Sequence, residues 1–198
     1  MSVDLERASR AIAEFLSALG HDPSREPELE GTPERVARAF AEELLAGAAV
    51  DLGALVRESL SAALTISVRQ PVVVKGLRVV TVCPHHLMPA LGEASVAYLP
   101  GEHLIGIGAV ARVVRAAAAR LTLQEQIGPE VLGALVEHAQ VELAACRITL
   151  RHSCLSARGA REHAAEVETW CVRGGRSMPR ASIGSDDRAV QALLQTLR

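Results

Sequence analysis

Two short clusters of cysteine and histidine carry the residue types that bind metal ions and move protons. The first is the run Cys83-Pro84-His85-His86, and the second is His152-Ser153-Cys154. A C-x-x-H pair lets a thiolate and an imidazole converge on one ion across a tight turn, which supplies half of a zinc site. We expect the third ligand to come from the second cluster. Three protein ligands would leave one zinc position for water, as in catalytic zinc sites.

The alternative is that these cysteines and histidines are unrelated core or loop residues. A lone C-x-x-H pair does not exclude this, but the presence of a second cluster argues against it. If the second cluster ends a strand, alternation along the strand places His152 and Cys154 on the same face. Cys146 and Cys171 lie in apolar strand patterns without a nearby histidine, and we expect them to be small buried hydrophobic residues.

The elements that must position these clusters are predicted by composition. Runs rich in β-branched residues predict antiparallel strands, and these lie at residues 65–68, 72–82, 93–100, 146–154 and 165–173. Two helices rich in Ala, Leu and Val are predicted at residues 108–120 and 127–145, and a last helix at 186–197. The order of the main elements is strand, strand, helix, helix, strand, strand. Both clusters then lie at strand ends.

The N-terminal part of the chain has a helical pattern. Apolar residues from Leu5 to Leu19 recur at helical spacing, and Thr32-Pro33 begins a second helix that we expect to reach about Leu45. Residues 47–61 favour neither a further helix nor a loop. We therefore place an N-terminal helical region at residues 1–62 and the main domain at residues 63–198.

Composition and charge exclude several classes of function. The 198 residues are 49% hydrophobic, carry a net charge of -2 and include only 2% aromatic residues, so neither nucleic acid nor an anionic membrane is an expected partner. The chain has no apolar run of about 20 residues, and its N-terminus is charged from Asp4 onward, so we predict neither a membrane span nor a signal peptide. A cytoplasmic location, where thiols stay reduced, is expected.

Six motifs occur in the order found in the GTP cyclohydrolase I family, which the sequence resembles from Thr32 to Arg161. They are a T-P-x-R-V-A helix, a C-x-H-H turn, a G-x-x-x-V-A-Y-x-P strand, an I-G helix start, a Q-E pair and an H-x-C-x-x-A-R-G segment. Six motifs in one order are far more specific than any single one. The resemblance implies an α+β tunnelling fold, in which a four-stranded antiparallel sheet with two helices on one face (ββααββ) joins copies of itself into a barrel.

The resemblance also implies a cofactor and a reaction. Zn²⁺ would be held by Cys83, His86 and Cys154, while His85 and His152 match the two catalytic histidines. The implied enzyme opens the guanine imidazole ring of GTP at C8 with a zinc-activated water, and gives formate and 7,8-dihydroneopterin triphosphate. We expect His152 to be the general acid and base and His85 its partner, although the two roles are exchangeable.

Substrate recognition follows from the same resemblance. Gln124 and Glu125 match the pair that reads guanine, because a carboxylate accepts from the exocyclic amine and the ring N–H together. Four arginines match positions that bind the triphosphate, since guanidinium forks suit phosphate oxygens; they are Arg35, Arg38, Arg112 and Arg158. The first two are expected to reach a neighbouring subunit. The implied assembly is a homo-oligomer, such as a decamer of two stacked pentamers, with active sites between subunits.

The sequence departs from the family at polar positions. Gly108 and Ala109 stand where the family usually has Ser-Lys, and Pro84 replaces a glutamate in C-E-H-H. A missing lysine weakens triphosphate binding, so we expect Ala109→Lys to strengthen it. These changes support an alternative, a specialised paralogue that acts on another guanine nucleotide or stops at a ring-opened product. A non-catalytic oligomeric subunit is a third hypothesis, and the intact histidines His85 and His152 argue against it.

Overall fold

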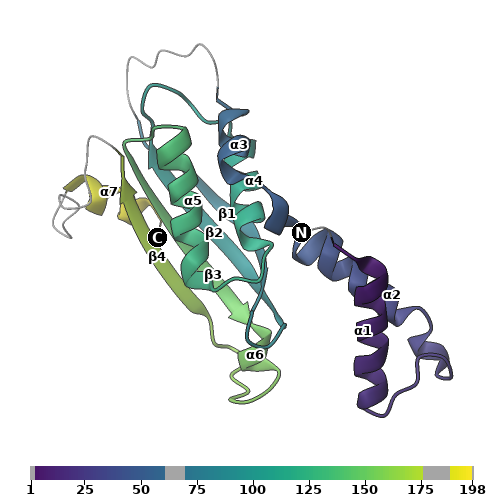
Figure 1. The fold of residues 1–198 in the computed structure, drawn as a ribbon. Coiled ribbons are helices and arrows are strands. Elements are labelled where there is room, and N and C mark those ends of the chain that lie inside the picture. The colour runs from purple at the N-terminus through teal and green to yellow at the C-terminus, as the bar shows by residue number, and fades with distance from the viewer. Residues whose placement is uncertain (1–2, 61–69, 176–187, 198) are drawn as a thin grey trace. The chain divides into compact units, whose positions relative to one another are not determined.

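A computed structural model describes residues 3–60, 70–175 and 188–197 (Figure 1). Its packing divides the chain into two compact units, residues 1–46 and 47–198. The boundary expected between residues 62 and 63, and the strand expected at residues 65–68, lie outside the described residues. Among the described helices, none has the length and apolar character needed to span a membrane.

The first unit contains the two helices that the sequence predicts. Helix α1 spans Leu5–Ala18, and the side chain of Asp4 caps it by accepting from the Arg7 amide at 2.9 Å. A 3-10 turn, η1, spans Pro27–Leu29 and precedes α2 at Thr32–Arg38. The second helix then continues as a π-helical segment, η2, over Ala39–Leu44. Helices α1 and α2 pack against each other.

The second unit is built on a four-stranded antiparallel sheet in the order β1-β2-β3-β4 (Figure 1). The strands span Val72–Val82, Pro89–Leu99, Leu143–His152 and Val167–Gly174. A bulge interrupts β1 between Val74 and Leu77, where Gly76 has a φ of 67°, a left-handed conformation that costs glycine little. The bounds of β1 agree with the sequence prediction, because β-branched residues fill both ends of the strand, at 72–74 and 79–82.

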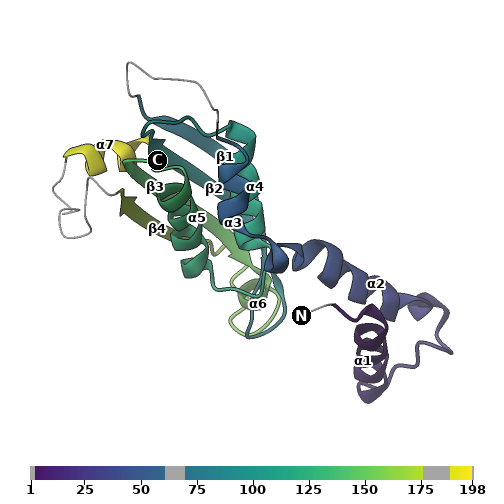
Figure 2. The ribbon, with the colours of Figure 1, turned by 45° about the horizontal axis from the view of Figure 1, so that its top comes forward.

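Two helices connect β2 to β3 and cover one face of the sheet. Helix α4 spans Ile107–Ala118 and α5 spans Gln124–His138; α3, at Leu52–Arg57, follows a 3-10 turn, η3, at Ala46–Ala49 and packs beside them (Figure 2). Apolar side chains from these helices and from all four strands form the main core. The ββααββ arrangement is thereby confirmed. Helix α5 ends at His138 and not at residue 145, because residues 143–145 pair with residues 97–99 of β2.

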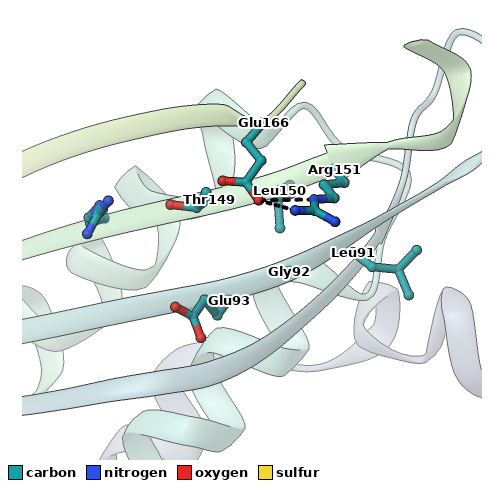
Figure 3. Close-up of a pocket in the computed structure, with 8 residues that line it drawn as sticks. Leu91, Gly92, Glu93, Thr149, Leu150, Arg151 and Glu166 are labelled. Carbon is teal, nitrogen blue, oxygen red and sulfur yellow. Dashed lines mark hydrogen bonds and ion pairs between the residues drawn. The ribbon is translucent and has the colours of Figure 1, made fainter. Parts of the chain in front are cut away.

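The opposite face of the sheet is covered only in part among the described residues. Helix α7, at Arg188–Thr196, packs on β2 and β3 and shares a small core with Ala97, Leu143 and Ala145. The rest of that face carries a cavity of about 470 Å³, over which the Nη2 of Arg151 lies 2.9 Å from an oxygen of Glu166 (Figure 3). This cavity shares no lining residue with the two cysteine and histidine clusters.

Candidate functional site

The first cluster lies in the tight turn that joins β1 to β2. The Cys83 amide donates to the carbonyl of Met88 at 3.0 Å, and the Leu87 amide donates to the carbonyl of Cys83 at 2.9 Å. Leu87 has a φ of 52°, which is left-handed backbone that costs an L-residue roughly 1–2 kcal/mol. The closed turn places the Cys83 Sγ 3.7 Å from the His86 Nδ1.

The second cluster follows β3 but is not all strand. Strand β3 ends at His152, and Ser153–Ser156 forms a single helical turn, α6, in which the Ala157 amide donates to the Ser153 carbonyl at 2.8 Å. The prediction of a strand through Cys154 is therefore wrong, since the chain turns helical one residue after His152. Cys154 occupies this helical turn and not a strand position on the face of His152.

Three ligand-type side chains meet at these two turns. The Sγ atoms of Cys83 and Cys154 and a ring nitrogen of His86 all lie within 4.8 Å of one another. In a tetrahedral zinc site with ordinary Zn–S and Zn–N bonds, a sulfur and a nitrogen ligand are about 3.6 Å apart. The 3.7 Å between Cys83 and His86 fits that value. The donor set, two sulfurs and one imidazole, is one that suits zinc.

The pKa of the Cys154 thiol bears on the same interpretation. Partial burial and the neighbouring Cys83 sulfur raise the pKa of the Cys154 thiol, while the charge of Arg158 acts to lower it. Burial and electrostatic repulsion from the Cys83 sulfur both disfavour a thiolate on Cys154. A divalent cation removes this repulsion by accepting both sulfurs as thiolates. A bound cation would therefore favour the thiolate form of Cys154.

His152 is held by a buried glutamine. Its Nε2 lies 2.8 Å from the Oε1 of Gln124, the first residue of α5, which is only 3% exposed. Burial lowers the pKa of His152, and the carboxylate of Glu125 raises it in part. The structure therefore brings Gln124, Glu125 and His152 together, as the Q-E and H-x-C motifs would require.

His85 and Arg158 are also near the cluster. The Nδ1 of His85 lies 3.9 Å from the Cys83 Sγ, and its ring centroid lies 6.2 Å from that of His86. Both His85 and Arg158 are exposed. These side chains can reach a bound molecule from solvent.

The remaining arginines are not joined to the cluster by any described contact. The Nη2 of Arg112 donates to the Oγ of Ser59 at 2.9 Å. Arg35 and Arg38 belong to the first unit and are exposed, and the Nη2 of Arg35 donates to the Oγ1 of Thr32 at 2.8 Å. Their assignment to the triphosphate stays a prediction.

Ala109 is buried, which corrects the expectation for a lysine at this position. Its side chain is 1% exposed and belongs to the main core, whereas Gly108 beside it is exposed. A lysine side chain at residue 109 would begin inside the core, where an ammonium is costly to bury. Because residue 109 lies in the core, we do not expect Ala109→Lys to strengthen triphosphate binding.

Some functional neighbours were not predicted. The amide nitrogen of Gln124 lies 3.1 Å from the carbonyl oxygen of Ile148, 2.9 Å from that of Val167 and 3.3 Å from the Oγ1 of Thr169. Alternation along β4 could have placed Val167 and Thr169 on the helix-covered face. Nothing in the sequence indicates that their polar atoms converge on Gln124.

The chain is similar to known enzymes of one family. A family model described as GTP cyclohydrolase I matches residues 8–182. GTP cyclohydrolase 1 of Leifsonia xyli subsp. xyli (strain CTCB07) is 38% identical over 178 residues, which cover 90% of this chain and 91% of the relative. GTP cyclohydrolase 1 of Streptococcus pyogenes serotype M49 (strain NZ131) is 35% identical over 175 residues, or 88% and 87% of the two chains.

A solved structure gives a weaker likeness. The crystal structure of the archaeosine synthase QueF-Like in the apo form aligns with 53% of this chain and 94% of its own, with 22% identity and a TM-score of 0.42. This score is too low to support a conclusion about this chain.

Proposed function

Because this chain belongs to the GTP cyclohydrolase I family, we propose that it is a zinc-dependent enzyme that opens the guanine imidazole ring of GTP at C8. The products would be formate and 7,8-dihydroneopterin triphosphate. The observation that carries the proposal is the convergence of Cys83, His86 and Cys154 within 4.8 Å, beside two further histidines.

The three converging side chains would hold the zinc ion. Three protein donors are the number found at catalytic zinc sites. When bound, zinc supplies Lewis acidity that activates a water molecule near neutral pH. Cys83 and Cys154 are partly buried, which would limit the access of solvent to an ion bound there.

The chain's other residues would bind the nucleotide and move protons. His152 is half-buried and hydrogen-bonded to Gln124 of α5, and it would protonate the purine nitrogen and shuttle protons. His85 is exposed at the turn and would be the partner of His152 in proton transfer. The Glu125 carboxylate is exposed, and its charge raises the pKa of His152 in part. It would accept from the guanine N1–H and exocyclic amine while the guanine ring lies against His152.

The triphosphate would be met by arginines. Arg158 is exposed, and its charge is close enough to Cys154 to lower the pKa of that thiol in part, so it would meet the triphosphate near the metal ligands. Arg112, Arg35 and Arg38 would complete the phosphate site in an oligomer, where residues of different subunits meet. Strands β1 and β4 form the two edges of the described sheet. Unpaired edges are suited to pairing with another copy of the chain, and a head-to-tail contact that closes gives a ring.

One observation favours a second candidate. Gly108 is exposed at the start of α4 and supplies no side chain to a nucleotide, and Ala109 points into the core. The specialised paralogue, which acts on another guanine nucleotide or stops at a ring-opened product, would need neither a serine nor a lysine there.

The test is product identification. Zinc-loaded protein is incubated with GTP, formate is measured, and every nucleotide product is identified by mass spectrometry, with Cys154→Ser as the control. Equal amounts of formate and dihydroneopterin triphosphate support the full reaction. Formate without a cyclised pterin supports the paralogue. Absence of formate from GTP, with zinc present, would reject the proposal.

A further inference from the structure

The hydrogen bonds of the Gln124 side chain fix the orientation of its amide group. The side chain is 3% exposed, and its nitrogen faces three acceptors, the carbonyl oxygens of Ile148 and Val167 and the Oγ1 of Thr169, at 2.9 to 3.3 Å. An amide nitrogen has two hydrogens to donate. Reversing the amide would set its oxygen against two carbonyl oxygens and leave buried acceptors without a donor, which is strongly unfavourable. The oxygen must therefore point to the remaining partner.

That partner is the imidazole of His152. The Gln124 Oε1 lies 2.8 Å from the His152 Nε2. An amide oxygen can only accept, so the Nε2 must carry a hydrogen whether the ring is neutral or charged. In the neutral ring the lone pair is then on Nδ1. The hydrogen bond also fixes the orientation of the ring.

We propose that Gln124 is a positioning residue that holds His152 in its Nε2–H form, so that Nδ1 is the nitrogen that accepts the proton. The proposal rests on the proposed function, which makes His152 the proton carrier. The proposal gives Gln124 and Glu125 different roles. Glu125 is exposed, so its carboxylate can meet guanine, while both polar atoms of the Gln124 side chain are already engaged inside the protein. Guanine selection then belongs to Glu125.

The kinetic test compares GTP with inosine triphosphate, which lacks the exocyclic amine. In Gln124→Met the side chain keeps its length and loses its hydrogen bonds. We expect kcat to fall about 10- to 100-fold for both substrates, by the same factor, with little change in KM, as when a residue that orients a reacting group is removed. Gln126→Met is the matched control in the same helical turn, because Gln126 accepts from Thr122 and is exposed. A rise in KM for GTP alone would make Gln124 a guanine contact and overturn the proposal.

The spectroscopic test needs no activity. Solid-state ¹⁵N spectra of histidine-labelled wild-type protein, with His152 assigned by comparison with His152→Gln, should show only the Nε2–H form of the neutral His152 ring. In Gln124→Met the Nδ1–H form should appear beside it. A wild-type ring protonated on Nδ1 would reject the proposal, even if the enzyme is active. If the protein does not act on GTP while the ring is Nε2–H, the proposed function fails and the tautomer assignment survives.

Discussion

Gly128 of α5 faces Cys171 of β4 so closely that a Cβ on Gly128 would lie 2.6 Å from the Cys171 Sγ. The helix and the sheet can approach at this point because the glycine has no side chain. Cys171 also lies directly opposite Cys146 in the β3–β4 ladder. The contact joins the helical layer to the sheet one turn beyond Gln124.

Gly128→Ala should therefore destabilise the protein. Overpacking costs about 1–3 kcal/mol, which exceeds the gain of roughly 0.5–1 kcal/mol from removing a glycine inside a helix. In a Cys171→Ala background the obstructing sulfur is absent, and the same substitution should become stabilising. Chemical unfolding of the four proteins of this cycle measures both values. Equal effects of Gly128→Ala in the two backgrounds would show that the sulfur is not the obstacle.

Removal of one metal ligand should abolish metal retention. We expect about one zinc per chain in the wild type and a loss of most of it in Cys154→Ser and in His86→Ala, because a catalytic site with two protein ligands is incomplete. Elemental analysis after dialysis measures the content. Cys171→Ala is the matched control, since it removes a thiol outside the cluster. Stoichiometric zinc in either ligand variant would refute the assignment.

His152→Ala should keep its metal and lose turnover. General acid and base catalysis contributes about 10²- to 10⁴-fold, so kcat should fall within that range while zinc content stays at the wild-type level. Elemental analysis and steady-state kinetics on the same preparation check both parts. Loss of zinc in this variant would instead make His152 a ligand.

Lysine should be tolerated at residue 108 and not at residue 109. Ala109→Lys places an ammonium in the core and should lower the free energy of unfolding by at least about 2 kcal/mol. Gly108→Lys should change it by less than about 1 kcal/mol, because a Cβ there meets only the Nη1 of Arg112, at 3.6 Å. Thermal unfolding of both variants measures the difference. Equal stabilities would mean that residue 109 does not face the core as described.

The sequence predicted the elements of the second unit better than their ends. Residues 72–82 begin and end with β-branched residues, and β1 has the predicted bounds. Leu143, Ala144 and Ala145 are good helix formers and were assigned to a helix, but pairing with β2 overrides that preference. The helical turn at Ser153–Ser156 is four residues long and has no periodicity from which it could be predicted.

The candidate site was predicted in part. The convergence of Cys83, His86 and Cys154 agrees with the motif spacing, because the turns at the ends of β1 and β3 fix where the ligands lie. The bonding of Gln124 could not be predicted, since its partners Ile148, Val167 and Thr169 are 24 to 45 residues away along the chain. Such contacts depend on sheet register, and local patterns contain no signal for them.

The cluster at Cys83, His86 and Cys154 also affects the stability of the folded chain. Its two sulfurs are about 70 residues apart in sequence. A shared ion would therefore form a reversible cross-link between the end of β1 and α6. For a permanent cross-link of that span, the chain-entropy relation gives about 4 kcal/mol, comparable with the whole stability of a small domain. Zinc starvation would then reduce the amount of folded protein as well as its activity, and a chelator would act on this chain as a denaturant does.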